Sequence, residues 1–546
     1  MLDNTTRDGY YYLYGTRGAC YCYRSKNLMD WEEIGSTINI SEGSEISKVL
    51  YTSIWAPEVV YDSDTELYYM FFSATPEEDT NVVAGEGVES GTPTELLLVA
   101  TSKYPDKDFR LVDFKNVESC GEDNLHTYNE TAGVVDADSE YKNAYPHYYA
   151  KYLMFDPDIY RAFSVANGRT NAGANRGGYE GAIDPHPYVD ENGDKYLFWV
   201  DSTGPDRICG VKMINWLQPD WSTATTLTYH SYYTVADWKA EQQGASVERV
   251  SYELSNVSIN EGPTVVKHND KYYLTFSVNS YKDNTYQIAQ AVSDSVLGNY
   301  RKLTEEEGGI LLSGYTAGSQ EVSGTGHHSF VIAGKQTYMV YHRHDDVTTM
   351  GAARNPAIDE VRWITITDKN GKELDVMYVN GPTSTMQPKI EAYSDYRNLA
   401  TEAVVSGTSD TSYLTDGLLS IYKNGNPAFI NNIKETNIQE TTTFTFDFRT
   451  LKTIRAILIY NSKMETTMFK NIKKIEIVRY KNLKEVIHTI ENVEFSSEYY
   501  KEDYIIPGSA VYVIGKQSNV KAIRITVGVP EGQESVGISE VRILGQ

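Results

Sequence analysis

The chain has 546 residues and a formal net charge of −26. An acidic surface of this kind repels phosphate backbones, which excludes nucleic acid as an expected partner. No run of about 18 apolar residues occurs and no signal peptide is recognisable, so no membrane span is expected. The length predicts two to four domains at roughly 150 residues each, or fewer if one is a large all-β unit.

The aromatic content is the most unusual feature of the composition. There are 44 Tyr, a residue that favours β-strands and whose exposed ring also stacks on sugars. The four cysteines have neither the spacing nor the accompanying histidines of a zinc site, and we expect buried thiols at Cys20, Cys22, Cys120 and Cys209.

A turn followed by an aromatic strand recurs five times along the chain. In each copy a Tyr is followed by Leu or Met, at Tyr12, Tyr69, Tyr196, Tyr273 and Tyr338. The turn residues suit tight hairpins and the aromatic runs suit sheet interiors. The predicted strands cover residues 10–16, 67–72, 195–199, 271–276 and 337–341.

Four of these units share a polar residue 11 or 12 positions before the Tyr, namely Glu58, Asp184, Glu261 and His327. A polar residue on one strand, then a hairpin, then an aromatic strand is the pattern expected of a propeller blade. Because innermost strands surround a common axis, we expect these four side chains to converge there. The polar, Gly- and Asn-rich stretch of about 76–180 is interpreted as an insert that forms loops over one face.

The pattern changes after about residue 390, where many short alternating strands are predicted. They include 444–448, 454–460, 522–527 and 538–543. Such a block favours a β-sandwich. The fold class is therefore predicted to be all-β, with a five-bladed β-propeller catalytic domain over 1–388 and a β-sandwich (jelly-roll) domain over 389–546.

Carboxylates at equivalent places in adjacent blades indicate glycoside hydrolysis. That reaction needs one protonated carboxyl group to assist the leaving oxygen, and one ionised carboxylate to activate water or attack the sugar. A third carboxylate can set the acid's protonation and orientation. Asp184 and Glu261 are the two candidates in register.

The surrounding motifs make the resemblance specific, and residues 3–385 resemble glycoside hydrolase family 43, whose members are five-bladed propellers. The similar elements are Trp55-Ala56-Pro57-Glu58, Ile183-Asp184-Pro185, Glu261-Gly262-Pro263, Gly324-x-Gly326-His327, the Ser25, Leu28 and Trp31 pattern, and the closing Arg354, Ile358 and Trp363.

The resemblance implies that Glu261 is the general acid and Asp184 the modulator of its pKa. It further implies a substrate contact for Arg354. Trp55, Glu58 and His327 are the other candidate substrate-binding residues, and Glu58 is favoured as a structural partner at the axis over a third catalytic carboxylate. No cofactor is required, although the resemblance places a structural calcium or another small cation beside His327 at the axis. Among neighbouring histidines, His328, His342 and His344 form a further metal-binding hypothesis, and Trp199 is assigned to core packing rather than to sugar stacking.

The general base is the point at which the sequence departs from the family. The resemblance implies an Asp before Pro in the first blade, and the register predicts its place at position 1 or 0. Three explanations remain open: the chain begins late, Asp3 serves after a shorter hairpin, or the base is absent, as in some galactan-cleaving relatives. The Asp-Pro site at Asp156 lies off the register and is interpreted as a loop feature.

The C-terminal block resembles discoidin-like (coagulation factor 5/8 type C) carbohydrate-binding modules, and both a sugar-binding and a purely structural role stay open. The predicted function is an exo-acting, inverting α-L-arabinofuranosidase or β-xylosidase acting on a plant oligo- or polysaccharide. The alternatives are a β-galactosidase without the usual base and an inactive glycan-binding propeller. Related sucrose and fructan enzymes fit less well, since their acid precedes Cys whereas Glu261 precedes Gly. An extracellular, periplasmic or cell-surface location is expected.

Overall fold

The computed structural model describes most of the chain. The described residues are 1–16, 20–38, 51–76, 96–112, 114, 154–155, 157–168, 181–202, 204–317, 319–346, 349–351, 353–383, 387–407, 410–421, 429–469, 471–494, 500–501, 504–505 and 510–546. No helix within these ranges is long and apolar enough to cross a membrane. The chain divides into two compact units. Unit 1 comprises 1–280, 288–303 and 326–331, and unit 2 comprises 281–287, 304–325 and 332–546.

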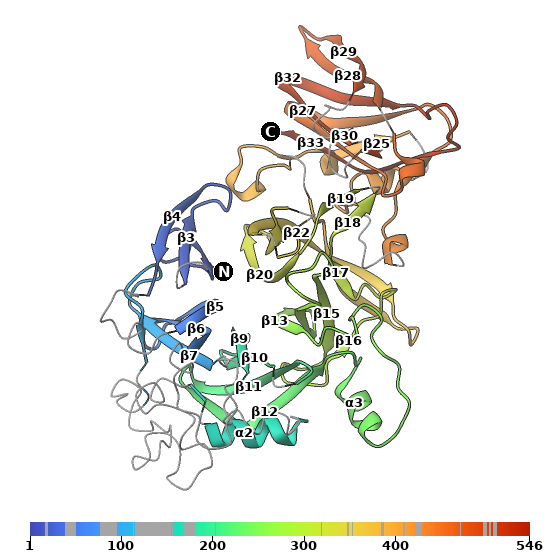
Figure 1. Cartoon of the computed structure of the whole chain (residues 1–546). Helices are drawn as coiled ribbons and strands as arrows, with labels where there is room; N and C mark the ends of the chain where they lie inside the picture. Colours follow the sequence, from blue (N-terminus) through green and yellow to red (C-terminus); the bar gives the residue numbers. More distant parts are fainter. Residues whose placement is uncertain are drawn as a thin grey trace. The chain divides into compact units, whose positions relative to one another are not determined.

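Five antiparallel sheets with four consecutive strands each account for the N-terminal two thirds of the chain, which confirms the predicted five-bladed propeller (Figure 1). The first blade contains β1 (Leu2–Asp3), β2 (Tyr11–Gly15), β3 (Tyr21–Ser25) and β4 (Trp31–Ser36). The second contains β5 (Tyr51–Asp62), β6 (Leu67–Pro76), β7 (Leu96–Ser102) and β8 (Arg110–Leu111). The third contains β9 (Ala182–Val189), β10 (Lys195–Asp201), β11 (Arg207–Asn215) and β12 (Gln218–Tyr229).

The fourth blade contains β13 (Asn260–His268), β14 (Lys271–Val278), β15 (Gln287–Ser293) and β16 (Arg301–Lys302). The fifth contains β20 (Gly326–Ala333), β21 (Gln336–His344), β22 (Arg354–Thr367) and β23 (Glu373–Val379). Between them lie β17 (Ile310–Leu312) and the hairpin of β18 (Tyr315–Ala317) and β19 (Ser319–Val322). All five predicted aromatic strands are therefore strands, each second in its blade.

Two α-helices occur among the described residues, and one of them corrects a prediction. Helix α2 (Pro157–Ala166) begins at the Pro that follows Asp156, because Pro is well suited to the first turn of a helix. Asp156 itself lies outside the described residues. Strands β7 and β8 also lie within 76–180, so the predicted loop insert partly belongs to the second blade; much of the remainder lies outside the described residues. Helix α3 (Val235–Gln242) starts at a capping box formed by Thr234 and Asp237.

Aromatic and aliphatic side chains of the first three blades form the core of unit 1. Trp199 is fully buried there against Phe155 and Trp221, which confirms its assignment to packing. Cys20, Cys22 and Cys209 are buried free thiols, as predicted, whereas Cys120 lies outside the described residues. Burial raises the pKa of Cys22 to about 12, so this thiol is unreactive at neutral pH.

Strands from residue 397 onward form one large antiparallel sheet with a core of its own. Its path runs β24 (Arg397–Asn398), β33 (Val536–Gly545), β27 (Thr442–Asn461), β32 (Ala510–Val527), β28 (Asn471–Lys481) and β29 (Lys484–Glu494). Strand β25 (Ala403–Ser406) pairs with β27, and β26 (Thr436–Ile438) pairs with β33. The remaining elements are β30 (Tyr500–Lys501), β31 (Tyr504–Ile505) and the 3₁₀ turns at Glu391–Tyr393, Ala400–Glu402, Thr411–Leu414, Phe429–Asn432 and Glu465–Thr467.

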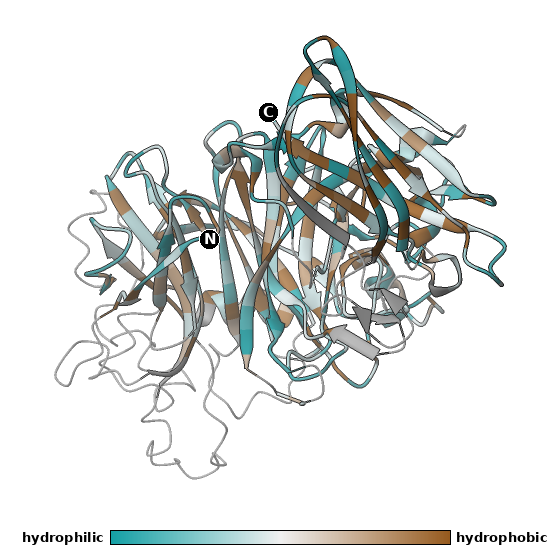
Figure 2. Cartoon of the chain, turned by 90° about the horizontal axis from the view of Figure 1, so that it is seen from above, coloured by the Kyte–Doolittle hydropathy of each residue, from teal (hydrophilic) through white to brown (hydrophobic). Residues whose placement is uncertain are grey.

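Alternation of apolar and polar residues explains this second core. Phe444, Phe446 and Phe448 are buried while the residues between them are half-buried, which is the period of two expected of a strand with one covered face. Figure 2 shows the corresponding brown hydrophobic stretches along the C-terminal strands. The predicted domain boundary at 388/389 stays a prediction.

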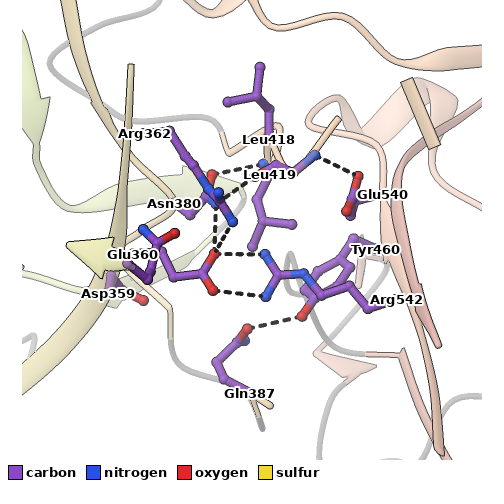
Figure 3. A network of polar contacts seen from close by, with 12 residues as sticks. Asp359, Glu360, Arg362, Asn380, Gln387, Leu418, Leu419, Tyr460, Glu540 and Arg542 are labelled. Atoms are coloured by element: carbon purple, nitrogen blue, oxygen red, sulfur yellow. Dashed lines mark hydrogen bonds and ion pairs between the residues drawn. The ribbon is translucent and has the colours of Figure 1, made fainter. Parts of the chain in front are cut away.

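Within unit 2, ionic contacts connect β22 of the fifth blade to β33 (Figure 3). The Arg542 guanidinium donates to both oxygens of Glu360, at 3.4 and 2.9 Å, and Arg362 and Asn380 donate to the same carboxylate at 3.1 and 3.2 Å. Burial works to raise the pKa of Glu360, but the charges of Arg542 and Arg362 hold it below its usual range. The C-terminal sheet and the fifth blade therefore share a fixed, charge-paired contact.

Candidate active site

The innermost strands of all five blades meet within unit 1. Strand β1 packs beside β5, β5 beside β9, and β9 beside β13. The Thr264 hydroxyl on β13 donates to the His328 carbonyl on β20 at 3.2 Å, and the Met1 amino group donates to the Ser329 hydroxyl at 3.2 Å. These contacts close the circle from β20 back to the start of β1, so side chains at the beginnings of the strands surround one axis.

Strands β5, β9, β13 and β20 each contain a residue in the left-handed region of backbone conformation. These residues are Ala56 (φ 53°), Asp184 (φ 52°), Gly262 (φ 59°) and His327 (φ 43°). In the first three strands the next residue is Pro. The pairing register shifts at the same place in β5, β9 and β13, which identifies a β-bulge. Bulges redirect side chains and are enriched beside active sites.

The bulge corrects the predicted alignment of the four polar residues. Three bulge residues lie four positions before the partner of their blade's Tyr, since Tyr69 pairs with Val60, Tyr196 with Tyr188 and Tyr273 with Val266. Asp184 therefore occupies a bulge position, whereas Glu261 comes one residue before a bulge and Glu58 two residues after one. His327 shares the positive φ of the bulge residues. Counting from Tyr could not reveal this, because a bulge adds an unpaired residue.

Asp184 and Glu261 lie on adjacent blades and are joined through the main chain. The Asp184 carboxylate accepts a hydrogen bond from the Gly262 N–H at 2.9 Å. Asp184 is buried, while Glu261 is half-buried and so retains access to solvent. His327 lies against this pair: its Nδ1 is 4.0 Å from Asp184 Oδ2. The predicted acid, its modulator and the axial histidine are thus brought together.

Glu58 belongs to a relay that crosses three blades. His186 Nδ1 lies 3.0 Å from both Glu58 carboxylate oxygens, and His186 Nε2 accepts from the Val265 N–H at 3.2 Å. Because Nε2 accepts, the ring proton of the neutral imidazole sits on Nδ1 and is donated to Glu58. Burial works to raise the pKa of Glu58, but His186 keeps it below the usual range, so Glu58 is ionised. Sequence reasoning overlooked His186, although it sits inside the Ile183–Pro187 motif.

Asp206 is a further buried carboxyl group that the sequence did not reveal. It directly precedes β11, where nothing in the local sequence marks it. Burial, followed by the charges of Glu261 and Asp184, raises the pKa of Asp206 well above its usual range. The position is informative because perturbed carboxyl groups gather at catalytic sites.

The other predicted residues have the following surroundings. Trp55 is half-buried on β5, one residue before the bulge. Arg354 belongs to unit 2, where it is exposed and its guanidinium lies 4.9 Å from the Tyr281 ring centre. The carboxylate of Asp3 accepts from both the main chain and the hydroxyl of Thr5, at 3.0 and 2.6 Å.

The first blade lacks a described bulge of its own. Tyr12 pairs with Leu2, so the position equivalent to the other bulges, four residues before Leu2, precedes Met1. Asp3 lies after Leu2 and is therefore not the structural equivalent of Asp184. The Ser25, Leu28 and Trp31 pattern has a structural explanation: the Ser25 hydroxyl accepts from the Leu28 N–H, and the Trp31 indole donates to the Leu28 carbonyl.

Within the described ranges, no group of three or more His, Cys, Asp or Glu side chains has the geometry to hold a metal ion. His328 contacts the Thr275 hydroxyl at 2.6 Å, and burial is the main cause that lowers its pKa to about 3. In unit 2, His344 contacts the Tyr281 carbonyl at 2.8 Å and the His342 ring stacks on Tyr286. The calcium and the histidine metal set stay predictions.

Comparison with known proteins agrees with this site. The model of the family Glycosyl hydrolases family 43 matches residues 169–365, which include Asp184, Glu261 and His327. The chain is 36% identical over 69 residues to an arabinan endo-1,5-alpha-L-arabinosidase C of Emericella nidulans, and 36% identical over 84 residues to a beta-D-galactofuranosidase xynD of Aspergillus niger. The two segments cover 12% and 15% of this chain, and only 21% and 23% of the relatives' own lengths.

Among solved structures, a thermostable family-43 glycoside hydrolase aligns with a TM-score of 0.47 and 22% identity, over 70% of this chain and 93% of the other. The five blades and the carboxyl groups beside their axis agree with the match of residues 169–365 to the glycosyl hydrolase family model.

Proposed function

We propose that the protein is an exo-acting hydrolase of α-L-arabinofuranosides or β-D-xylosides in plant polysaccharide, with Glu261 as the general acid. One observation carries the proposal: the Asp184 carboxylate accepts from the N–H of the residue directly after Glu261, at 2.9 Å. This bond fixes the two carboxyl groups at one end of adjacent innermost strands. The names of the two curated relatives, an arabinosidase and a galactofuranosidase, support a furanoside as the first substrate to test.

In the proposed reaction Glu261 donates its proton to the glycosidic oxygen as the bond to the anomeric carbon breaks. Asp184 keeps the acid protonated and oriented, while the ionised Glu58 and its partner His186 shape the axial pocket. An inverting reaction requires a base on the opposite sugar face, about 6.5–9.5 Å from the acid. The equivalent place in the first blade falls ahead of Met1, and Asp3 stays the alternative within the sequence.

The test is release of nitrophenol from α-L-arabinofuranoside, β-D-xyloside, β-D-galactofuranoside and β-D-galactopyranoside. We expect release from one substrate. On the methyl glycoside of the same sugar, Glu261→Gln and Asp184→Asn should lose at least 100-fold in kcat, since general acid catalysis contributes about 10²–10⁴-fold. Glu248→Gln, which changes an exposed acid of unit 1, is the matched control and should retain full activity. Proton NMR of the first-formed sugar anomer then tests inversion.

The remaining outcomes separate the alternatives. Release from the galactopyranoside alone would favour the β-galactosidase without the usual base. Glycan binding with no release from any substrate, also when the chain is extended upstream to include an Asp-Pro, would favour the inactive binding propeller. This proposal also includes a discoidin-like sandwich that binds sugar in the C-terminal strands, a calcium ion at the axis and an extracellular location. Glycan binding by the Glu261→Gln variant is the measurement that tests sugar binding by the C-terminal strands.

A further inference from the structure

A buried polar cluster in unit 1 includes Asn260, the residue directly before Glu261. We call it the Lys302 cluster, and it consists of Lys302, Glu253, Asn260, Asp206 and the main-chain carbonyl of Tyr229. Lys302 is completely buried, and its ammonium group donates to Glu253 at 2.5 Å, to the Asn260 side-chain oxygen at 2.7 Å and to the Tyr229 carbonyl at 2.9 Å. An ammonium group has three N–H donors, so each one has an acceptor.

Asn260 makes three hydrogen bonds within and beside the Lys302 cluster. Its N–H donates to the Asp206 carboxyl group at 3.1 Å, its side-chain oxygen accepts from Lys302, and its side-chain amide donates to the Ile259 carbonyl at 2.8 Å. Asp206 also donates its own N–H to the Ser258 carbonyl at 3.0 Å. The chain from 258 to 260 is therefore fixed immediately before Glu261.

Burying a lysine requires a reason, because desolvation of a charge costs several kcal/mol and an apolar side chain would fill the same space. Lys302 sits on β16, far from Asn260 in the sequence, and the bond joins the last strand of the fourth blade to its first. The first strand then changes direction at the Gly262 bulge. A rigid anchor one residue before the acid limits how far the acid can drift, and an error of about 1 Å in placing a catalytic group can cost about 100-fold in rate.

We propose that Lys302 and Asn260 are positioning residues that fix Glu261 for proton donation to the leaving group, with Asp206 holding the main chain of Asn260. The proposal rests on the proposed function. Neither Lys302 nor Asn260 touches the substrate; both act through the backbone that precedes Glu261. The role is distinct from that of Asp184, which binds the backbone on the other side of the acid.

The test is the dependence of the rate on the leaving group in Asn260→Ala. This variant leaves Lys302 with Glu253 and the Tyr229 carbonyl, and leaves the Asp206 bond to the main chain in place. A glycoside with a poor alkoxide leaving group, such as the methyl glycoside, needs the acid, whereas the 2,4-dinitrophenyl glycoside does not. We expect kcat to fall 10-fold or more on the methyl glycoside and less than twofold on the dinitrophenyl glycoside, with KM within twofold on both.

Two further variants separate positioning from folding. Asn260→Asp restores an acceptor for Lys302 and should recover most of the rate on the methyl glycoside. Asn279→Ala removes another buried asparagine of unit 1, which accepts from the Leu254 N–H, and should lower the unfolding temperature without changing the ratio of the two rates. Equal losses on both glycosides in Asn260→Ala, or a changed ratio in Asn279→Ala, would overturn the positioning role.

Failure of the proposed function has a different signature. A wild-type enzyme that hydrolyses no glycoside, or a Glu261→Gln variant that keeps full rate on the methyl glycoside, removes the reaction and the positioning role with it. If Glu261→Gln loses activity but Asn260→Ala loses rate equally on both glycosides, the proposed function stands and only the positioning role of the Lys302 cluster is refuted.

Discussion

The contact between the fifth blade and the C-terminal sheet permits a quantitative test through Arg542→Met. Methionine retains much of the length of arginine but removes both bonds to Glu360 and leaves that carboxylate underpaired (Figure 3). Loss of one partner from a buried ion pair costs about 3–5 kcal/mol. Because Arg362 and Asn380 still donate to Glu360, and because its side chain is 22% exposed, we expect no more than the lower end, about 3 kcal/mol. Urea unfolding and hydrogen exchange of β22 and β33 measure this loss.

The matched control is Arg397→Met, which breaks an exposed pair with Glu402 in the same unit and should cost less than about 1 kcal/mol. The double variant Glu360→Gln with Arg542→Met should recover stability, since no unpaired charge remains buried. Equal costs for the Arg542 and Arg397 variants, or additive costs in the double variant, would refute this reasoning.

The same pair predicts a dependence on pH. The pKa of Glu360 is lower in the folded protein than in the unfolded chain. Its stabilising contribution is therefore complete above the unfolded value of about 4.3 and is lost as the pH falls through the folded value. The stability difference between the wild type and Arg542→Met should accordingly shrink in acid.

Two other substitutions test Glu540 and Gly262. Burial raises the pKa of Glu540 well above its usual range. Wild-type stability therefore falls as the pH rises from the unfolded pKa of about 4.3 towards the folded pKa. Glu540→Gln should unfold at a higher temperature than the wild type at pH 7 and at the same temperature near pH 3. In Gly262→Ala the new methyl group has a positive φ and lies 3.3 Å from the His327 ring, whereas Gly244→Ala has a positive φ in open space. Both should lose about 1–2 kcal/mol, but only Gly262→Ala should lose kcat; equal activities would contradict a role for the bulge.

Local patterns predicted the blades well, because a blade is built from hairpins that are close in sequence. Each turn before an aromatic run starts a strand, and the period of two along Phe444, Phe446 and Phe448 marks a buried face. The motif around Asp184 was recognisable for the same reason. Prediction failed for 76–180, since polar composition resembles loops even where β7 and β8 complete a blade.

Contacts between residues far apart in sequence could not be predicted. His186 lies 128 residues from Glu58, and Lys302 lies 42 residues from Asn260. No local pattern marks such partners, because burial and pairing depend on which blades become neighbours. The bulges are a further case, since an unpaired residue shifts the register without a change in composition.

The sequence by itself determined the all-β class and the five repeated units, because these follow from hydrophobic period and turn chemistry, and its motifs marked Asp184 and Glu261 as candidates. Only the tertiary structure decided which residues surround Glu261. The physical reason is that a charge such as Lys302 is tolerated inside the protein only where three acceptors from separate strands converge on it, and that convergence exists only in the folded chain.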